Sequence, residues 1–345
     1  IAKSGEEIAN EQTYNFEDRG GRRLAVRPEM TPTVARLVAA KIGELNFPLR
    51  WFSIPNLYRY ERPQRGRLRE HWQVNVDIFG CPTFEADLEV ISTAVMLLKA
   101  LGADKTMFRV HINNRRFFND VIAAIAGTDA EGSRKVSKVV DRKNKIPREE
   151  YVKELTELGL DEAQIGKIDA LYTMSVEEAT ALCPDSQGSA ELLNLFRELE
   201  ACGLAGYCVF DFGIIRGLDY YTGTVFEVFD EAPENNRAMF GGGRYDNLVG
   251  LFVKNTNISG VGFGFGDVTL ENFLVTHNLI PDIYNEGTKV LVARFNDVPY
   301  EKYMALTDAL RAAGVPASLY LGEKKFGKQI DYAVKGAYSH VAILG

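Results

Sequence analysis

The sequence predicts an α+β protein with more than one folding unit, and three observations support this prediction. Two strand-like stretches lie between Trp51 and Phe79, a mainly helical and charge-rich segment runs from about Val121 to Cys208, and strands alternate with helices after residue 289. A chain of 345 residues can bury more than one hydrophobic core. Its 46% hydrophobic and 25% charged residues are typical of a soluble globular protein.

The elements around the strand pair follow from turn and helix signals. Residues 14–27 read as two strands around a DRGG turn, and a helix begins at Pro28 to Thr33, because proline suits a first helical turn. After the strand pair, an apolar stripe at helical spacing stops at Gly102, which predicts a long amphipathic helix. The stripe consists of Phe84, Leu88, Ile91, Val95 and Leu98.

Residues 121–206 read as a helical insertion, because strand character resumes abruptly at Tyr207. Ser175 and Glu178 have the spacing of a capping box, which predicts the start of one helix. The insertion also carries a basic run, for which two interpretations remain open: contact with an RNA backbone, or a solvated helix face. This run comprises Arg134, Lys135, Lys138, Arg142, Lys143, Lys145 and Arg148.

Glycine-rich strands follow the insertion. The stretch CVFDFGIIRGLDYYTGTVFEVFD predicts a turn at Arg216 to Asp219 and then a strand rich in aromatic and β-branched residues. The stretches GGGRYDNLVG and GVGFGFGDVTL predict strands whose backbones approach a ligand closely. Neither has the GxGxxG or GxxxxGKS/T spacing between a strand and a helix, so a Rossmann or P-loop site is disfavoured.

The last part of the chain reads as a separate α/β unit. After the spacer LIPDIYNEGT come strand KVLVARF, a helix from about Pro299 to Ala313, strand ASLYLG, a helix from Lys325 to Tyr338 and strand HVAILG. Alternation of strands and helices with these lengths predicts a small parallel sheet.

The strand pair carries the polar groups that indicate function. Strand side chains alternate between faces, so Leu57, Arg59 and Glu61 share one side of the first stretch. On the second stretch, Gln73, Asn75 and Asp77 share one side, and the opposite side is an apolar face of Trp72, Val74, Val76 and Ile78. The loop between them carries four arginines, whose guanidinium groups are preferred partners of phosphate oxygens. They are Arg62, Arg65, Arg67 and Arg69.

These residues predict a site for a triphosphate and a small polar molecule, with an exposed basic hairpin as the alternative. The net charge of −7 argues against indiscriminate binding of nucleic acid. No apolar run is long enough to span a bilayer and nothing at the start resembles a signal peptide, so we expect no membrane contact. Cysteines without CxxC spacing favour a reduced, cytoplasmic protein without structural zinc. They are Cys81, Cys183, Cys202 and Cys208.

The four histidines, His71, His111, His277 and His340, lie in no nucleophile motif and are expected to be structural. Between Tyr14 and about Leu270 the chain carries the segments RPEMT, YRYERPQRGRLREHWQ, RGLDYYTGTVFE and GGGRYDNL. Together these segments resemble the motifs of histidyl-tRNA synthetases, a family of class II aminoacyl-tRNA synthetases.

The resemblance implies an antiparallel sheet flanked by helices, with a helical insertion and a C-terminal anticodon-binding domain. We expect a catalytic domain at 1–278 that lacks its N-terminal part, a linker at 279–288, and an incomplete anticodon-binding domain at 289–345. The resemblance also implies a homodimer, although the family's dimer-forming first motif would precede Ile1.

Roles for single residues follow only where they match the family's motifs. By resemblance, Arg59 contacts the α-phosphate of ATP, Glu61 lies near the adenine, and Arg67 or Arg69 contacts the outer phosphates. Arg216 resembles the arginine that faces both the histidine carboxylate and the α-phosphate.

The histidine site and the tRNA contacts are implied in the same way. Glu29, Thr31 and Gln73 resemble the acceptors of the histidine α-ammonium group, and Arg62 and Gln64 correspond to contacts with the acceptor end of tRNA. Asp77 and Tyr221 resemble the pair that reads the imidazole, with Tyr220 and Tyr245 completing the pocket.

The residue types fit the chemistry that the family implies, which is ATP-dependent activation of L-histidine and its transfer to tRNA(His). The carboxylate of the substrate is itself the nucleophile, so no metal site of the protein and no Ser, Cys or His nucleophile is required. The protein holds two anions in line and offsets charge, a task for arginines together with Mg²⁺ bound to ATP. Arg59 and Arg216 are the expected catalytic residues.

One position departs from the family pattern. Thr269 stands where the third class II motif has an arginine that packs on the nucleotide. Loss of such a contact costs about 1.5 to 3 kcal/mol if nothing replaces it. This departure keeps a second hypothesis open, a non-catalytic paralog that acts as a histidine-sensing regulatory subunit of ATP phosphoribosyltransferase or as a tRNA sensor.

Overall fold

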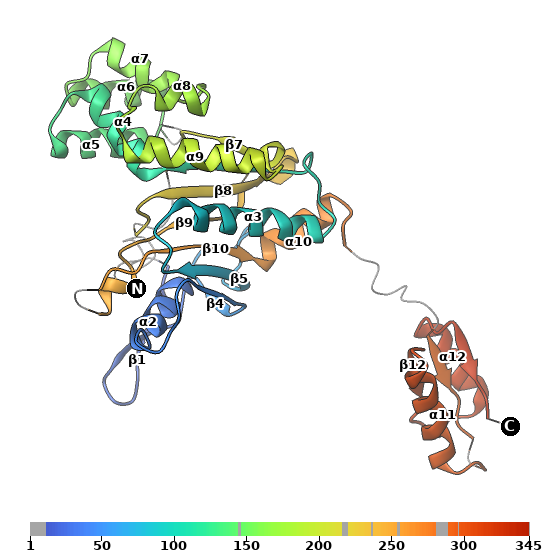
Figure 1. Cartoon of the computed structure of the whole chain (residues 1–345). Coiled ribbons are helices and arrows are strands. Elements are labelled where there is room, and N and C mark those ends of the chain that lie inside the picture. The colour runs from blue at the N-terminus through green and yellow to red at the C-terminus, as the bar shows by residue number, and fades with distance from the viewer. Residues whose placement is uncertain are drawn as a thin grey trace. The chain divides into compact units, whose positions relative to one another are not determined.

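The protein consists of two compact units, residues 1–279 and residues 280–345, in a computed structural model (Figure 1). The structure describes residues 12–143, 146–215, 220–235, 237–253, 256–280, 289–295 and 297–344. Most of the expected linker, the expected turn at 216–219 and Lys145 of the basic run lie outside these ranges. No helix in the described ranges is long and apolar enough to cross a membrane.

The first unit is built on an eight-stranded sheet. Its order is β3-β5-β10-β9-β8-β6-β7, and β4 also pairs with β5. Neighbouring strands are antiparallel except β6 and β7, which are parallel, so the expected antiparallel sheet is in fact mixed at this edge. The strands are β3 (Leu49–Ser53), β4 (Asn56–Tyr58), β5 (Glu70–Phe79), β6 (Phe108–Asn114), β7 (Cys208–Phe210), β8 (Thr224–Asp230), β9 (Ala238–Arg244) and β10 (Gly260–Gly266).

Strand β10 shows how the sequence separates the two faces of this sheet. In GVGFGFG the apolar side chains Val261, Phe263 and Phe265 are buried in the core. The alternating glycines therefore lie on the opposite face and leave it without side chains, so that a ligand can lie against the backbone.

Helices cover the core face of the sheet. Helices α3 (Phe84–Ala100) and α10 (Asp267–Thr276) lie along it in Figure 1. Of the predicted apolar stripe on α3, Ile91, Val95 and Leu98 are buried and Leu88 is partly buried in the core, whereas Phe84 at the start of the helix is only half-buried. The expected apolar face of β5 is only partly correct, because Trp72 is 52% exposed. It lies near the outer end of the strand, beside β4 and beyond the part that the helices cover.

The N-terminal hairpin and the following helix lie on the glycine face. Strands β1 (Asn15–Glu17) and β2 (Arg23–Ala25) form the expected hairpin around the DRGG turn. Helix α2 (Thr31–Ala40) buries one side in a small core with Phe79, Tyr245 and Val249. This packing brings the beginning of α2 to the same region as the ends of β5 and β9.

The helical segment that the sequence assigns to an insertion at 121–206 follows a helix that already begins at Arg115. Asn114 caps the first helix by accepting hydrogen bonds from two backbone amides, and the predicted capping box of Ser175 and Glu178 is confirmed. Its helices are α4 (Arg115–Ala126), α5 (Ala130–Val140), α6 (Arg148–Glu157), α7 (Glu162–Ala170), α8 (Val176–Thr180) and α9 (Gln187–Ala201).

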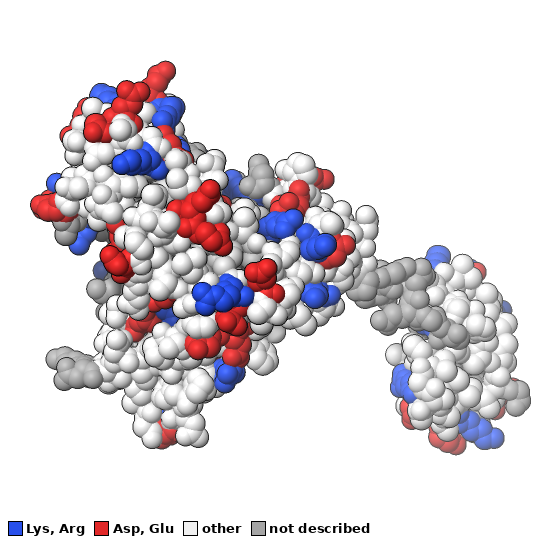
Figure 2. Space-filling view, turned by 45° about the horizontal axis from the view of Figure 1, so that its top comes forward, with Lys and Arg blue, Asp and Glu red and all other residues white. Residues whose placement is uncertain are grey.

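The basic run of the insertion is largely paired within the insertion. Arg142 pairs with Glu154, while Lys143 and Arg148 both pair with Asp169. On the face drawn in Figure 2, basic side chains are interspersed with acidic ones. These contacts favour the interpretation as a solvated helix face over a continuous RNA-binding surface.

The second unit has the expected parallel order, with β11 between β12 and β13. Two small apolar cores, one on each side of the sheet, hold its helices. Its elements are β11 (Val290–Val292), α11 (Tyr300–Ala312), β12 (Ala317–Leu319), α12 (Phe326–Lys335) and β13 (His340–Ala342).

Candidate active site

A cavity of about 350 Å³ lies on the glycine face of β5, β9 and β10. The sheet forms its floor, the beginning of α2 closes one end, and the arginine-rich loop after β4 borders the other. Most of the predicted site residues line this cavity together. They are Glu29, Thr31, Arg59, Glu61, Arg67, Gln73, Tyr220, Tyr221 and Tyr245.

The closed end of the cavity presents acceptors for an ammonium group. Glu29 is only 6% exposed, and its Oε2 accepts a hydrogen bond of 3.1 Å from the Tyr220 hydroxyl. The Gln73 amide lies directly over Gly264, where an added Cβ would come within 2.7 Å of Gln73 Cδ. The missing side chain at Gly264 therefore gives Gln73 its place in the cavity.

Asp77 lies buried beside this end, on the floor strand β5. Its Oδ1 accepts hydrogen bonds from the Tyr245 hydroxyl and, at 3.4 Å, from the Thr31 hydroxyl. Burial raises the pKa of Asp77 to about 6, and these two hydrogen bonds offset only part of that effect. Asp77 therefore titrates near neutral pH, and it is mainly ionised above pH 6.

Three tyrosines lie beside the two buried carboxylates, Glu29 and Asp77. Asp77 bonds Tyr245, while Tyr221 packs by its ring against Tyr220 with centroids 5.2 Å apart. Burial raises the pKa of all three hydroxyls, so they stay neutral at physiological pH. Neutral hydroxyls can donate and accept, which suits the two ring nitrogens of an imidazole.

The open end of the cavity carries the basic groups. Arg59 donates from Nε to the carbonyl of Pro28, the residue before Glu29, at 2.9 Å, so its guanidinium lies between the two ends. Arg67 lies 3.3 Å from Glu61, between Nη1 and Oε2. His71 also lines this end, and burial, together with the charge of Arg59, lowers its pKa, so its imidazole is neutral at pH 7.

A second cavity of about 520 Å³ adjoins the first on the outer side of the arginine-rich loop. It contains Arg62 and Gln64, the two residues assigned to tRNA, together with Arg67 and Arg69. Arg69 donates to the Glu61 carbonyl at 3.0 Å, and its guanidinium lies 4.7 Å from the centroid of the Tyr60 ring. Of the two arginines predicted for the outer phosphates, only Arg67 borders both cavities.

Thr269 lies at the N-terminal end of α10, where it borders the first cavity. Its hydroxyl donates to the carbonyls of Met239, at 2.8 Å, and Gly266, at 3.1 Å. The side chain thus ties α10 to β9. Arg216, the second predicted catalytic residue, lies outside the described residues.

Sequence reasoning missed His71 and Glu227 as cavity-lining residues. Glu227 is the only charged residue between Thr224 and Phe229, a run of aromatic and β-branched residues, and this isolation was a usable signal. Within the described ranges, no group of three or more His, Cys, Asp or Glu side chains is arranged to hold a metal ion. All four cysteines are free thiols.

The cavity therefore joins a buried acidic and tyrosine-rich end to a basic end. A family model described as histidyl-tRNA synthetase matches residues 1–267. The chain belongs to the histidyl-tRNA synthetase family. A histidine--tRNA ligase of Leptospira biflexa is 44% identical over 100% of this chain and 79% of its own length. One of Thermoplasma volcanium is 35% identical over 99% of this chain and 79% of its own length.

Solved structures agree with this membership of the histidyl-tRNA synthetase family. An ATP phosphoribosyltransferase regulatory subunit/histidyl-tRNA synthetase from Bacillus halodurans is similar, with a TM-score of 0.78 and 26% identity over 97% of this chain and 83% of that chain. A histidyl-tRNA synthetase from Nostoc also has a TM-score of 0.78 over 94% of this chain and 77% of that chain. Its 23% identity supports the class II α+β fold alone.

Proposed function

We propose that this protein is a histidine--tRNA ligase, which uses ATP to convert L-histidine to histidyl-adenylate and then transfers the histidyl group to the terminal ribose of tRNA(His). One observation carries the proposal for the site: Glu29, Arg59 and Arg67 line a single cavity, and the buried Asp77 bonds the hydroxyls of Thr31 and Tyr245, which line it as well. The family and its relatives of the same name support the overall reaction.

In the first step, an oxygen of the histidine carboxylate attacks the α-phosphorus of ATP, and the bond from that phosphorus to the bridging oxygen breaks. Pyrophosphate leaves with that electron pair. Glu29, Thr31 and Gln73 hold the α-ammonium group, which aims the carboxylate at the phosphate end of the cavity. Arg59 and Arg216 offset the negative charge on the α-phosphate. Because the histidine carboxylate is the nucleophile, no nucleophile from the protein takes part.

The nucleotide enters as its complex with Mg²⁺. Two carboxylates that line the cavity, those of Glu61 and Glu227, would supply hard oxygen donors to this ion. The ion would offset charge on the phosphates. In the second step, a ribose hydroxyl of tRNA attacks the acyl carbon of the adenylate, and AMP leaves. Arg62 and Gln64, in the adjoining cavity, contact the acceptor end.

The same proposal covers the other partners. The parallel unit at 289–345 binds the anticodon, and the protein acts as a homodimer in the cytoplasm. Exposed apolar side chains at the outer edge of the sheet support the dimer, because β3 is an edge strand. Phe52 and Trp72, which are 74% and 52% exposed, lie on one face, and Trp51, which is 38% exposed, lies on the other face of β3.

Histidine-dependent exchange between ATP and pyrophosphate tests the first step. We expect exchange by the wild-type protein and its loss in Arg216→Ala. Absence of exchange in the wild type, with histidine binding retained, would replace this proposal with a histidine-sensing regulatory subunit or a tRNA sensor. Aminoacylation of tRNA(His) transcripts then tests the second step.

A further inference from the structure

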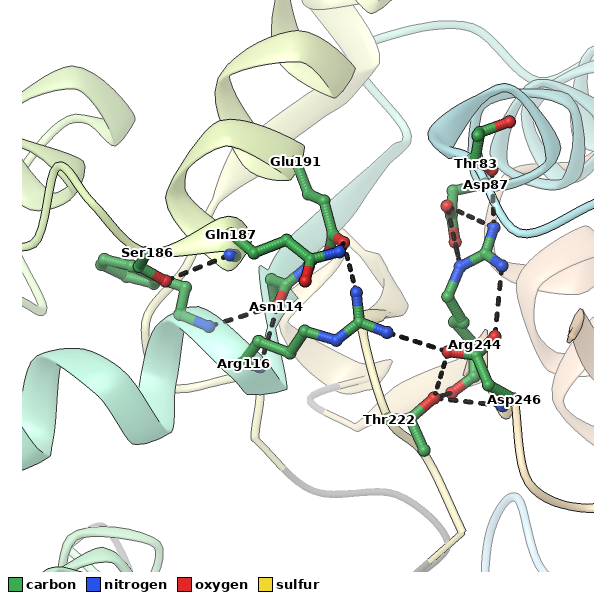
Figure 3. A network of polar contacts seen from close by, with 12 residues as sticks. Thr83, Asp87, Asn114, Arg116, Ser186, Gln187, Glu191, Thr222, Arg244 and Asp246 are labelled. Carbon is green, nitrogen blue, oxygen red and sulfur yellow. Dashed lines mark hydrogen bonds and ion pairs between the residues drawn. The ribbon is translucent and has the colours of Figure 1, made fainter. Parts of the chain in front are cut away.

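The carboxylate of Asp246 lies where three parts of the first unit meet (Figure 3). Its Oδ2 accepts hydrogen bonds from Arg116 Nη2, at 2.9 Å, and from the Thr222 hydroxyl, at 3.0 Å. Its Oδ1 accepts a hydrogen bond of 3.3 Å from Arg244 Nη1. The three donors come from the insertion, from the loop before β8 and from the end of β9.

Arg244 joins the Asp246 carboxylate to a buried ion pair in the core. Its side chain is only 2% exposed, and it bonds both carboxylate oxygens of Asp87 on α3 at distances between 2.7 and 3.1 Å. It also donates to the carbonyls of Cys81 and Thr83. These partners restrain the Arg244 guanidinium to one position, because moving it would leave a buried charge unpaired. The hydrogen bond from Arg244 therefore restrains the Asp246 carboxylate as well.

The insertion reaches Asp246 through Arg116, in the first turn of α4. In Figure 3 the guanidinium of Arg116 lies between Asp246 and Glu191 of α9, and it pairs with both. Helices α4 and α9 pack closely at Gly188, where an added Cβ would come within 2.1 Å of the Phe117 amide nitrogen. Arg116 therefore joins Asp246 to the base of the whole insertion.

The loop before β8 reaches the same carboxylate through Thr222. The Thr222 hydroxyl also accepts a hydrogen bond from the Asp246 amide at 3.1 Å, and the Thr222 amide donates to the Arg244 carbonyl at 2.7 Å. The residues directly before Thr222 are Tyr220 and Tyr221, which line the histidine end of the cavity. The hydrogen bonds of Thr222 thus fix the backbone next to Tyr220 and Tyr221, and with it the positions of both side chains.

We propose that Arg116 and Thr222 are positioning residues for histidine binding, which act on Tyr220 and Tyr221 through the Asp246 carboxylate. The base of the helical insertion then sets the shape of the histidine end and leaves the phosphate end unchanged. This inference rests on the proposed function, because it takes the two tyrosines as part of a histidine site. Neither Arg116 nor Thr222 lines the cavity itself.

The decisive variant is Thr222→Val, which keeps the shape of the side chain and replaces only the hydroxyl with a methyl group. Loss of a hydrogen bond to a charged group predicts a rise of roughly tenfold in KM for histidine. We expect KM for ATP in the exchange reaction to change less than about twofold, since among the described residues no hydrogen bond or ion pair joins this network to Arg59, Glu61 or Arg67. Histidine affinity, measured by calorimetry, should fall by the same factor as KM rises.

Arg116 is tested by Arg116→Ala, Arg116→Lys and the double variant with Thr222→Val. If Arg116 acts through Asp246, the double variant raises KM for histidine no more than the stronger single variant, and Arg116→Lys restores part of the affinity. The matched control is Arg142→Ala, which removes an ion pair with Glu154 inside the insertion and reaches no cavity residue. It should leave both KM values unchanged.

Equal rises in both KM values, or a histidine KM unchanged by Thr222→Val, would overturn the inference while wild-type exchange keeps the proposed function. If the wild-type protein binds histidine but shows no exchange, only the proposed function is contradicted. The inference can still be tested then, because calorimetry measures the effect of Thr222→Val on histidine affinity. A wild-type protein that neither exchanges nor binds histidine contradicts both.

Discussion

The two ends of the cavity are held in different ways. At the histidine end, Asp77 and Glu29 are 2% and 6% exposed, and tyrosine hydroxyls already bond both carboxylates. At the phosphate end, Arg67 comes from a loop and is half exposed, and its partner Glu61 is the nearest carboxylate. One end is therefore built by buried, mutually bonded groups, and the other by charges on a surface loop.

This difference matches what each end must recognise. A small polar ring is distinguished from similar rings by buried hydrogen-bonding groups, because a wrong ligand leaves them unpaired. A triphosphate carries enough charge to be bound by guanidinium groups on an adaptable loop. Changes at the histidine end should thus alter stability and selectivity together, whereas changes at the phosphate end should alter nucleotide binding alone.

The largest expected effect is that of Asp77→Asn. Burial raises the pKa of this carboxyl from 3.8 to about 6, so its contribution to folding is full below about pH 4 and is lost as the pH rises through 6. At pH 8 the ionised carboxylate costs about 3 kcal/mol of folding free energy. We expect Asp77→Asn to raise the free energy of unfolding at pH 8 but not at pH 4, and to lower kcat/KM for histidine by roughly 10³ or more.

Urea unfolding at both pH values and the exchange assay measure these two effects. Comparison with the wild type at each pH removes the contribution of Asp87, whose pKa burial also raises to about 6. Asp331→Asn, at an exposed carboxylate paired with Lys328, is the control and should change neither property. A variant that keeps full activity would show that Asp77 does not read histidine.

At the phosphate end we expect Arg67→Ala to raise KM for ATP by roughly 10- to 100-fold, the effect of one lost charge-assisted contact. KM for histidine should stay within about twofold, and the free energy of unfolding should change by less than about 1 kcal/mol, since the Glu61 pair is exposed on one side. Exchange kinetics with each substrate varied in turn give both constants. Equal changes in KM for ATP and KM for histidine would contradict the division of the cavity into a histidine end and a phosphate end.

Gly264→Ala sharpens the comparison within the histidine end. A methyl group there would come within 2.7 Å of Gln73 Cδ, so the flexible amide must move away from its place over the glycine. We expect KM for histidine to rise roughly tenfold, because one acceptor of the ammonium group is displaced. Gly166→Ala, in α7 with nothing within 4 Å of the added Cβ, is the matched control. If both substitutions behave alike, Gln73 has no part in binding.

The smallest effect separates the two arginines that the sequence placed together. Arg69 lines the second cavity but not the first. Arg69→Ala should therefore leave KM for ATP unchanged and raise KM for tRNA in aminoacylation by a few-fold, as expected for a partly exposed phosphate contact. A rise in KM for ATP instead would restore the original assignment of Arg69 to the outer phosphates.

Local patterns predicted much of the fold, because they depend on neighbours in the chain. The capping box at Ser175, the stripe on α3 and the alternation that brings Gln73 and Asp77 to one face are of this kind. Asn114, which caps α4, was a signal in the sequence for a helix that begins at Arg115.

Contacts between distant segments were not predictable in the same way. The hydroxyl that bonds Asp77 belongs to Tyr245, which follows β9, and alternation along β5 gives no information about it. Likewise, alternation placed Trp72 on an apolar face, but only the extent of the covering helices decides that it is exposed. The side on which Arg69 lies depends on the fold of its loop around Tyr60.

The floor of the cavity also limits how this sequence can diverge. A Cβ at Gly241 would lie 2.8 Å from the Phe226 carbonyl oxygen, and one at Gly262 would lie 2.3 Å from the Val76 carbonyl oxygen. Because both obstacles are backbone atoms, no change of rotamer relieves them. Substitution is therefore disfavoured at the glycines of the floor. The phenylalanines of β10 face the core on the other side of the sheet, where other apolar side chains can replace them at lower cost. During evolution this sequence can thus change more readily in its core than on the surface where substrates lie.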